Sequence, residues 1–167
     1  MVNIARALTS SNHPSKFAPD VRLPYMVEVS VTAEQMIAAK GGAIASADVY
    51  DVALVPAGSV IRGVWARKDT AMTGTSVDLS LTVGLTGGTA NLFVTAWDFD
   101  AAATGAFGPV GAGVVLGSVN GTATQGVSFT VAAQTGTWLT GRMTFFIEVI
   151  DLSDYDNSRS GIVTLGS

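Results

Sequence analysis

The chain has 167 residues, of which 48% are hydrophobic and only 13% are charged, roughly half the charged share of an average globular protein. It contains no cysteine, which excludes disulfides and thiolate metal sites. This length predicts one domain with a hydrophobic core. A surface built from small neutral residues loses little hydration when it meets another protein, so the composition favours assembly.

Residues 1–24 are expected to form an extended N-terminal arm ahead of a single domain at 25–167. Three prolines in this stretch disfavour helix. Three basic residues against one acid give the arm a net charge of +2, so the total of −4 leaves −6 for the remaining residues. Its basic residues are Arg6, Lys16 and Arg22. The first residues lack the apolar core of a signal peptide, so we expect synthesis in the cytoplasm.

Residues 25–32 alternate between apolar and more polar positions, which predicts a strand with one buried and one wetter face. Residues 33–40 (AEQMIAAK) are good helix formers followed by two glycines, so one or two helical turns are expected there. This is the only helix that the sequence predicts.

Further short strands are separated by turn signals. They are expected at 48–55, 59–67, 75–83, 90–97, 113–119, 126–133, 142–151 and 160–166. In the strand at 59–67, Val60, Arg62, Val64 and Ala66 should share one face, and Ile61 and Trp65 should lie on the other. Eight or nine short strands are typical of an all-β sandwich, jelly roll or barrel.

Neither of the two long uncharged stretches, 79–97 and 101–141, is expected to span a membrane, because glycines and threonines interrupt both. Nucleic-acid binding needs a basic face, whereas the body is acidic and the isoelectric point is about 4.7. The sequence therefore predicts neither a membrane nor a nucleic-acid partner.

The only histidine, His13, lies in the arm, which argues against a histidine-dependent triad or a multi-histidine metal site. No catalytic residue and no cofactor is expected. Carboxylates gather in two places, Asp98 with Asp100, and Asp151 with Asp154 and Asp156. Such clusters either bind a cation or form the turns that close strand ends, and the sequence leaves both open.

Three tryptophans, Trp65, Trp97 and Trp138, lie on separate predicted strands among aliphatic residues. Packing in the core or in a protein interface is favoured over a sugar-stacking platform. A carbohydrate-binding module would instead expose the three indoles together on one concave face.

Three stretches of the sequence stand out together: DVYDVALVPAGSVIRGVWARKDTAMTGTSVDLSLTVG, the Asp-rich turn AWDFDAA and the late strand MTFFIEVI. Through them, residues 47–100 and 142–150 resemble capsid cement or head-decoration proteins of tailed bacteriophages. The resemblance implies an antiparallel, jelly-roll-like sandwich of about eight strands, with no catalytic residues to carry over. It also implies a homotrimer that binds the major capsid protein on the outer surface of the virion.

These features together predict a structural protein that bridges coat subunits and so stabilises the shell. The partner-binding residues are expected to be the arm cations and the tryptophans: Arg6, Lys16, Arg22, Trp65, Trp97 and Trp138. The alternatives are a carbohydrate- or receptor-binding module of a phage fibre and a tail or tube subunit.

Overall fold

The computed structural model describes residues 2–7, 24–55, 59–109, 118–119 and 125–151. Within this part, seven strands belong to one sheet and one short helix packs beside it. The elements are β1 (Val2–Ala7), β2 (Tyr25–Thr32), α1 (Ala33–Lys40), β3 (Val49–Val55), β4 (Ser59–Leu85), β5 (Val94–Asp98), β6 (Ser118–Val119) and β7 (Gln125–Asp151). The predicted all-β class and the single short helix are confirmed.

Two very long strands, β4 and β7, organise the sheet. Each has 27 residues, and they pair antiparallel from Ser59 opposite Asp151 to Leu85 opposite Val127. The shorter strands flank this β4–β7 ribbon: β2 and β6 lie along one half, whereas β3 and β5 lie along the other. β1 adds to β3, and this is the only parallel pair among the described strands.

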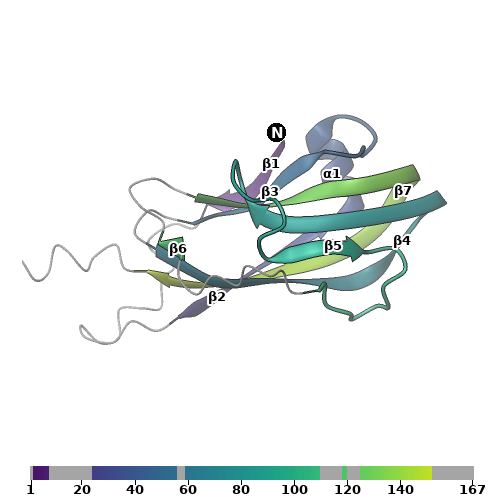
Figure 1. Cartoon of the computed structure of the whole chain (residues 1–167). Coiled ribbons are helices and arrows are strands. Elements are labelled where there is room, and N and C mark those ends of the chain that lie inside the picture. Colours follow the sequence, from purple (N-terminus) through teal and green to yellow (C-terminus); the bar gives the residue numbers. More distant parts are fainter. Residues whose placement is uncertain (1, 8–23, 56–58, 110–117, 120–124, 152–167) are drawn as a thin grey trace, which may run out of the picture.

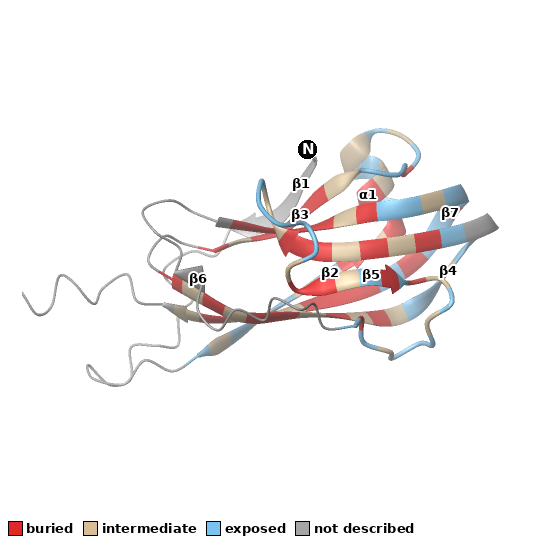
Figure 2. Cartoon of the chain, in the orientation of Figure 1, coloured by how far each residue is buried: buried red, intermediate tan, exposed pale blue. Residues whose placement is uncertain are grey.

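The β4–β7 ribbon folds over on itself. Phe129 and Phe145 belong to the same strand, yet their rings stack with centroids 5.2 Å apart. Sixteen residues of straight strand would separate them by about 50 Å. The two halves of the ribbon therefore form two layers (Figure 1). Both layers contain buried residues, which are red in Figure 2, and the stacked rings of Phe129 and Phe145 join the two layers in the core.

The fold-over coincides with irregular pairing at two glycines of β7. Thr70 and Thr73 pair with Arg142 and Thr140, so two residues of β4 oppose the single residue Gly141. Two residues of β4 also oppose Gly136, because Thr75 and Asp78 pair with Thr137 and Thr135. Both glycines have positive φ, 135° at Gly141 and 73° at Gly136. A bulge with an extra residue on one strand bends a ribbon and increases its twist. The bulges thus explain where the ribbon turns back.

Several predicted strands prove to be parts of longer ones. The strands expected at 59–67 and 75–83 are two halves of β4, and those at 126–133 and 142–151 are two halves of β7. The glycines and threonines between them mark bulges within continuous strands. The strands at 25–32 and 48–55 and the helix at 33–40 are confirmed to within a residue, while 90–97 shortens to β5.

The predicted faces of the strand at 59–67 are confirmed only in part: Val64 and Ala66 lie opposite Trp65 as predicted, but Ile61 lies on the same face as Val64 and Ala66. The pairing shifts between Ile61 and Gly63, so Arg62 is an extra residue and the alternation changes phase after it. Ile61, Val64 and Ala66 are all buried. Trp65, by contrast, points outward and is partly exposed.

The beginning of the predicted arm belongs to the sheet, because Val2–Ala7 form β1 and pair with β3. Residues 8–23, the strand expected at 160–166 and most of that expected at 113–119 lie outside the described residues. Among the described residues, no helix combines the length and the hydropathy needed to cross a membrane.

Candidate protein-docking face

An apolar hollow opens on the outward side of the layer formed by β2, β4 and β7. It has a volume of about 520 Å³ and is lined by Met26, Trp65, Arg67, Phe107 and Phe146. We call these five residues the aromatic face. Met26 and Phe107 are 53% and 55% exposed, which is unusual for large apolar side chains that gather in one place.

Strand pairing brings the aromatic face together. Trp65 of β4 lies directly opposite Phe146 of β7, and Met26 is on the outward face of β2, the next strand of the sheet. Phe107 comes from the loop 99–109, and its ring centroid is 6.1 Å from that of Phe146. Aromatic rings at such distances contribute stability beyond the area that they bury.

The loop 99–109 is fastened to β4 by Lys68, which places Phe107. The ammonium of Lys68 is buried and donates hydrogen bonds to the carbonyl oxygens of Asp100 and Ala102, at 2.8 and 2.6 Å. The backbone NH of Lys68 also donates to the carbonyl of Ala106. Burial lowers the pKa of Lys68, although the carboxylates of Asp100 and Asp98 oppose this effect.

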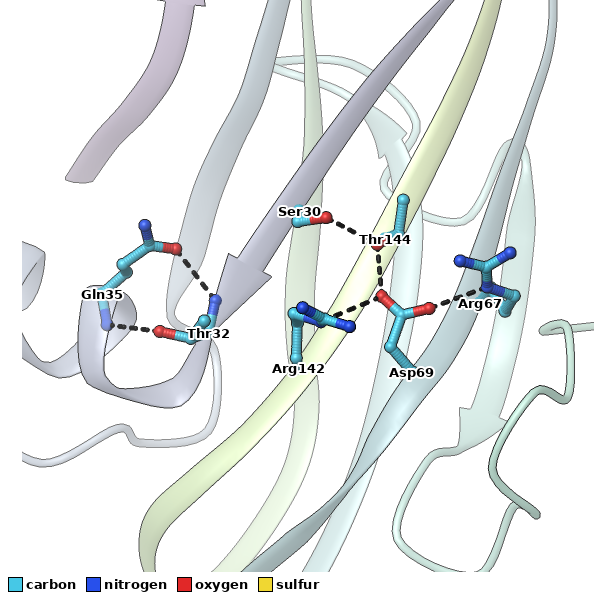
Figure 3. Close-up of polar contacts among 7 residues, drawn as sticks. All are labelled: Ser30, Thr32, Gln35, Arg67, Asp69, Arg142 and Thr144. Carbon is cyan, nitrogen blue, oxygen red and sulfur yellow. Dashed lines mark hydrogen bonds and ion pairs between the residues drawn. The ribbon is translucent and has the colours of Figure 1, made fainter.

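Arg67 links the aromatic face to a polar network. Its guanidinium carbon lies 5.0 Å from the centroid of the Phe146 ring, a cation–π contact. Its Nε donates to Oδ1 of Asp69 at 2.7 Å. Arg142 approaches the second oxygen, Oδ2, at 3.5 Å. Asp69 therefore sits between two cations, as Figure 3 shows.

Two hydroxyl groups complete this network. The Thr144 hydroxyl donates to Oδ2 of Asp69, and the Ser30 hydroxyl lies 2.7 Å from that of Thr144 (Figure 3). Because the single hydroxyl proton of Thr144 goes to the carboxylate, Ser30 is the donor in the second bond. The chain of contacts thus crosses the sheet from β2 through β7 to β4.

The environment of Asp69 stabilises its ionised form. Burial alone would raise its pKa, but the hydrogen bond from Thr144 and the two guanidinium groups together hold the pKa below the usual value of 3.8. The carboxylate is only 5% exposed, whereas the Arg142 side chain is 53% exposed. The Arg142 side chain is therefore exposed at the surface, and the Asp69 carboxylate is buried beneath it.

A second ion pair, between Arg62 and Glu148, borders the aromatic face on the side away from Asp69. Arg62 donates from Nη1 to Oε1 of Glu148 at 3.0 Å, and its side chain is the more exposed of the two. The aromatic face thus has an apolar centre, and three arginines lie around it: Arg62, Arg67 and Arg142. Protein interfaces commonly combine exposed aromatic residues, methionine and arginine in this way.

The structure separates the three predicted tryptophans. Trp65 belongs to the aromatic face. Trp97 and Trp138 are 4% and 2% exposed and lie in the core of the chain, where Trp97 packs edge-on against Phe99. Expecting these two at a partner surface was wrong for the single chain, because their alternation within β5 and β7 turns them inward. The exposed trio expected of a sugar-binding module is therefore not formed.

The structure describes only one of the three predicted arm cations. Arg6 pairs in register with Ala53 of β3, so its backbone belongs to the sheet. Lys16 and Arg22, like His13, lie outside the described residues.

The carboxylates of the AWDFDAA turn accept hydrogen bonds from backbone NH groups, one within the turn and one from β4. Oδ1 of Asp100 accepts from the backbone NH of Leu79 at 2.6 Å, and Oδ1 of Asp98 accepts from that of Ala101 at 3.3 Å. The described residues contain no group of three potential metal ligands. Asp154 and Asp156 lie outside them.

Sequence reasoning missed four members of the aromatic face, namely Met26, Arg67, Phe107 and Phe146. Met26 occupies a position that the alternation of 25–32 assigns to the wetter face, and a large apolar residue there is a signal that could have been used. Phe107 gave no such signal, because contacts of its loop with Ala66, Arg67 and Lys68 of β4 bring it to Phe146.

No protein-family model matches the chain, and none of the curated proteins is similar to it in sequence. Solved structures are similar in fold. A chain of the capsid of Ralstonia phage GP4 aligns over 80% of this chain and 88% of its own length, with a TM-score of 0.59 and 15% identity. A chain of the cyanophage Pam1 capsid aligns over 83% and 99%, with a TM-score of 0.55 and 20% identity.

A third similar chain comes from the acid-stable capsid of Helicobacter pylori bacteriophage KHP30. It aligns over 80% of this chain and 92% of its own length, with a TM-score of 0.50 and 12% identity. At these identities the likeness concerns the fold. This protein therefore shares its fold, over about four fifths of its length, with chains found in three phage capsids.

Proposed function

We propose that this protein is a structural component of a bacteriophage capsid and that it acts as a decoration, or cement, protein on the outer surface of the head. The observation that carries the proposal is the shared fold. The matched capsid chains are covered over 88%, 99% and 92% of their lengths, so the similarity relates whole chains of comparable size. The proposed location is the virion, and the proposed partner is the major capsid protein.

The aromatic face supports docking as the mode of action. Met26, Phe107 and the outward side of Trp65 offer apolar area that a partner can desolvate, and the arginines of the rim supply charge at its border. Tryptophan and arginine are enriched among the residues that dominate the binding energy of protein interfaces, and phenylalanine and methionine are enriched in the interfaces themselves. In this proposal the face contacts coat subunits, and the arm cations Lys16 and Arg22 add long-range attraction.

The folded-over sheet supports the jelly-roll-like architecture that the proposal includes. Its two layers enclose one core, as in a sandwich, although the β4–β7 ribbon runs continuously through both. A homotrimer is the proposed form on the head, because several copies joined together bind a repeating lattice through high effective concentration.

Imaging heads assembled with and without this chain tests the proposal. We expect cryo-electron microscopy to show additional density on the outer surface only when the chain is present, and mass spectrometry to find it in purified heads. Density in the tail tube would favour the tail-subunit alternative instead. Heads with no bound chain at saturating concentration would contradict the proposal.

Substitutions in the aromatic face test its role directly. We expect Trp65→Ala and Phe107→Ala each to weaken attachment to heads by about tenfold or more, as for interface hot spots, when the bound fraction is measured by co-sedimentation. Leu139→Ala is the matched control, because Leu139 is also a large exposed apolar side chain, 58% exposed, that does not line the face. Equal losses for all three variants would contradict the assignment of the face.

A further inference from the structure

A groove runs along the outer edge of β2, between this strand and α1. It has a volume of about 840 Å³, a size typical of sites that hold a small ligand. One wall is formed by the consecutive residues 28–31 of β2, and the other by Gln35, Ala38 and Ala39 of α1. Consecutive strand residues point to opposite faces of a sheet, so what these four share is the edge of the strand.

This edge of β2 is open for pairing. Among the described strands, β2 pairs only with β7. In an antiparallel pair, part of the backbone NH and carbonyl groups of each strand point away from the partner. Across the groove, Ala38 and Ala39 carry only methyl groups, which leaves space for another backbone. The groove therefore has the form of a site that accepts an extended segment as an additional strand.

We propose that residues 160–166 of a second copy of this chain occupy the groove. The segment reads Ser-Gly-Ile-Val-Thr-Leu-Gly, with three β-branched residues in succession and no proline, which favours a strand. Residues 8–23 suit the groove less well, because they contain two prolines that cannot donate to a ladder. Residues 110–117 are held at both ends by described neighbours.

Topology favours a second copy over the same chain. β7 ends at Asp151, near the end of β2 at which the chain enters that strand, because Tyr25 lies opposite Val149. A tail from the same chain would have to reverse its direction around the Tyr25 end of β2 before it could run along the outer edge of this strand.

A neighbouring tail meets no such obstacle. The 16 residues after Asp151, 152–167, reach up to about 50 Å when extended. The contact is head-to-tail, because the tail of one copy enters the groove of the next, and head-to-tail contacts close into rings when the rotation allows. This inference rests on the trimer in the proposed function and identifies the contact that holds it together.

The absence of cysteine from the chain makes cross-linking a clean test. One preparation carries Glu28→Cys, at an exposed position that lines the groove. Others each carry a single cysteine at position 162, 163, 164 or 165. Neighbouring strands lie within disulfide distance, so oxidised mixtures are expected to give a linked dimer of Glu28→Cys with at least one tail variant. No linked dimer at any of the four positions would overturn the proposal, as would an exclusively intrachain link when both cysteines are in one chain.

A proline substitution tests whether the tail drives assembly. Val163→Pro removes a backbone donor from the proposed strand, whereas Ser153→Pro, the matched control, changes the tail outside it. By size-exclusion chromatography with light scattering, we expect trimers for the intact chain and for Ser153→Pro, and monomers for Val163→Pro. Circular dichroism should be the same for all three. A trimeric Val163→Pro variant would overturn the inference.

The same preparations separate this inference from the proposed function. Tail-dependent trimers that do not attach to heads would refute the proposed function and leave the contact between copies intact. Attachment to heads by a protein whose oligomeric state does not depend on the tail would refute this inference alone.

Discussion

Asp69 shows how an irregularity in the sheet places one side chain. Lys68 and Thr70 pair with the consecutive residues Met143 and Arg142, so Asp69 is the extra residue of a bulge in β4. Bulges re-aim the side chain of the residue that they insert. The carboxylate is thereby directed at Arg67, Arg142 and the Thr144 hydroxyl, and it ties the rim of the aromatic face to the sheet.

Replacing Asp69 should lower stability in a pH-dependent way. Because the folded state lowers the pKa of Asp69, ionisation stabilises the fold fully above its unfolded pKa of about 4, and this contribution is lost as the pH falls through the lower folded value. We expect Asp69→Asn to reduce the free energy of unfolding at pH 7 by about 2 kcal/mol, typical of losing hydrogen bonds to a charged group. The difference from wild type should shrink as the pH falls below about 4.

Urea denaturation across this pH range measures the effect. Asp78→Asn is the control, since Asp78 is an exposed acidic residue on the same strand. A difference between wild type and Asp69→Asn that stays constant down to pH 2 would contradict the stabilising role of the ionised carboxylate.

At the scale of elements, the positive-φ glycines of β7 determine where the ribbon turns back. At Gly141, φ is 135°, and a Cβ atom would collide with the Met72 side chain and lie 3.0 Å from its Cα. Residues other than glycine are strained in this backbone region. The β4–β7 ribbon therefore depends on glycine at this position for its local geometry.

We expect Gly141→Ala to destabilise the protein by about 1–3 kcal/mol, the usual range for backbone strain of this kind. Gly42→Ala is the matched control, because φ at Gly42 is not positive and no atom lies within 4 Å of the added Cβ. The control should change stability by less than about 0.5 kcal/mol. Thermal denaturation of the two variants decides the matter, and equal melting temperatures would argue against a special role for Gly141.

Local patterns predicted some elements accurately and others poorly. The helix at 33–40 was predictable because its boundaries are local: Thr32 and Gln35 form a reciprocal cap at its start, and Gly41 ends it with φ of 74°. The alternation in β2 was equally local. The continuity of β4 was not predictable, since glycine is compatible with both a turn and a bulge. Only pairing with β7 decides between them.

The candidate site was predicted only in part for the same reason. Trp65 was identified, but the bulge at Arg62 places Ile61 on the face opposite Trp65, although the alternation had put the two on the same face. Composition alone could not distinguish Trp65 from Trp97, because both lie among aliphatic residues. Their burial depends on contacts between strands far apart in the sequence, which alternation does not reveal.

At the scale of the whole molecule, charge is divided between an acidic body and a basic segment near the N-terminus. The proposed docking depends on both the aromatic face and these cations. Arg6 should be left intact in any test, because its backbone pairs with Ala53 in the sheet. Lys16 and Arg22 can be changed without altering a described strand.

We expect the double substitution Lys16→Ala and Arg22→Ala to weaken attachment to heads and to reduce its dependence on ionic strength. Attraction between exposed charges is screened over about 10 Å at 0.1 M salt, so the wild type should bind less well as salt increases. Measuring binding at about 50 mM and about 300 mM salt provides the comparison, with Asp20→Ala as the control in the same segment. Identical salt dependence for the double variant and the wild type would contradict the prediction.

The place of β7 within the sheet also constrains when the protein can fold. The last ten residues of this strand, 142–151, lie between β2 and the first half of β4. A nascent chain on the ribosome therefore lacks the strand that both must pair with until residues 142–151 have been synthesised. Ser59 pairs with Asp151, which is far from it in the sequence. The entropy cost of closing so long a loop slows the pairing of β4 with β7. During synthesis the valines of β2 and β4 stay exposed, and chaperones that bind apolar extended segments should engage the chain at this stage.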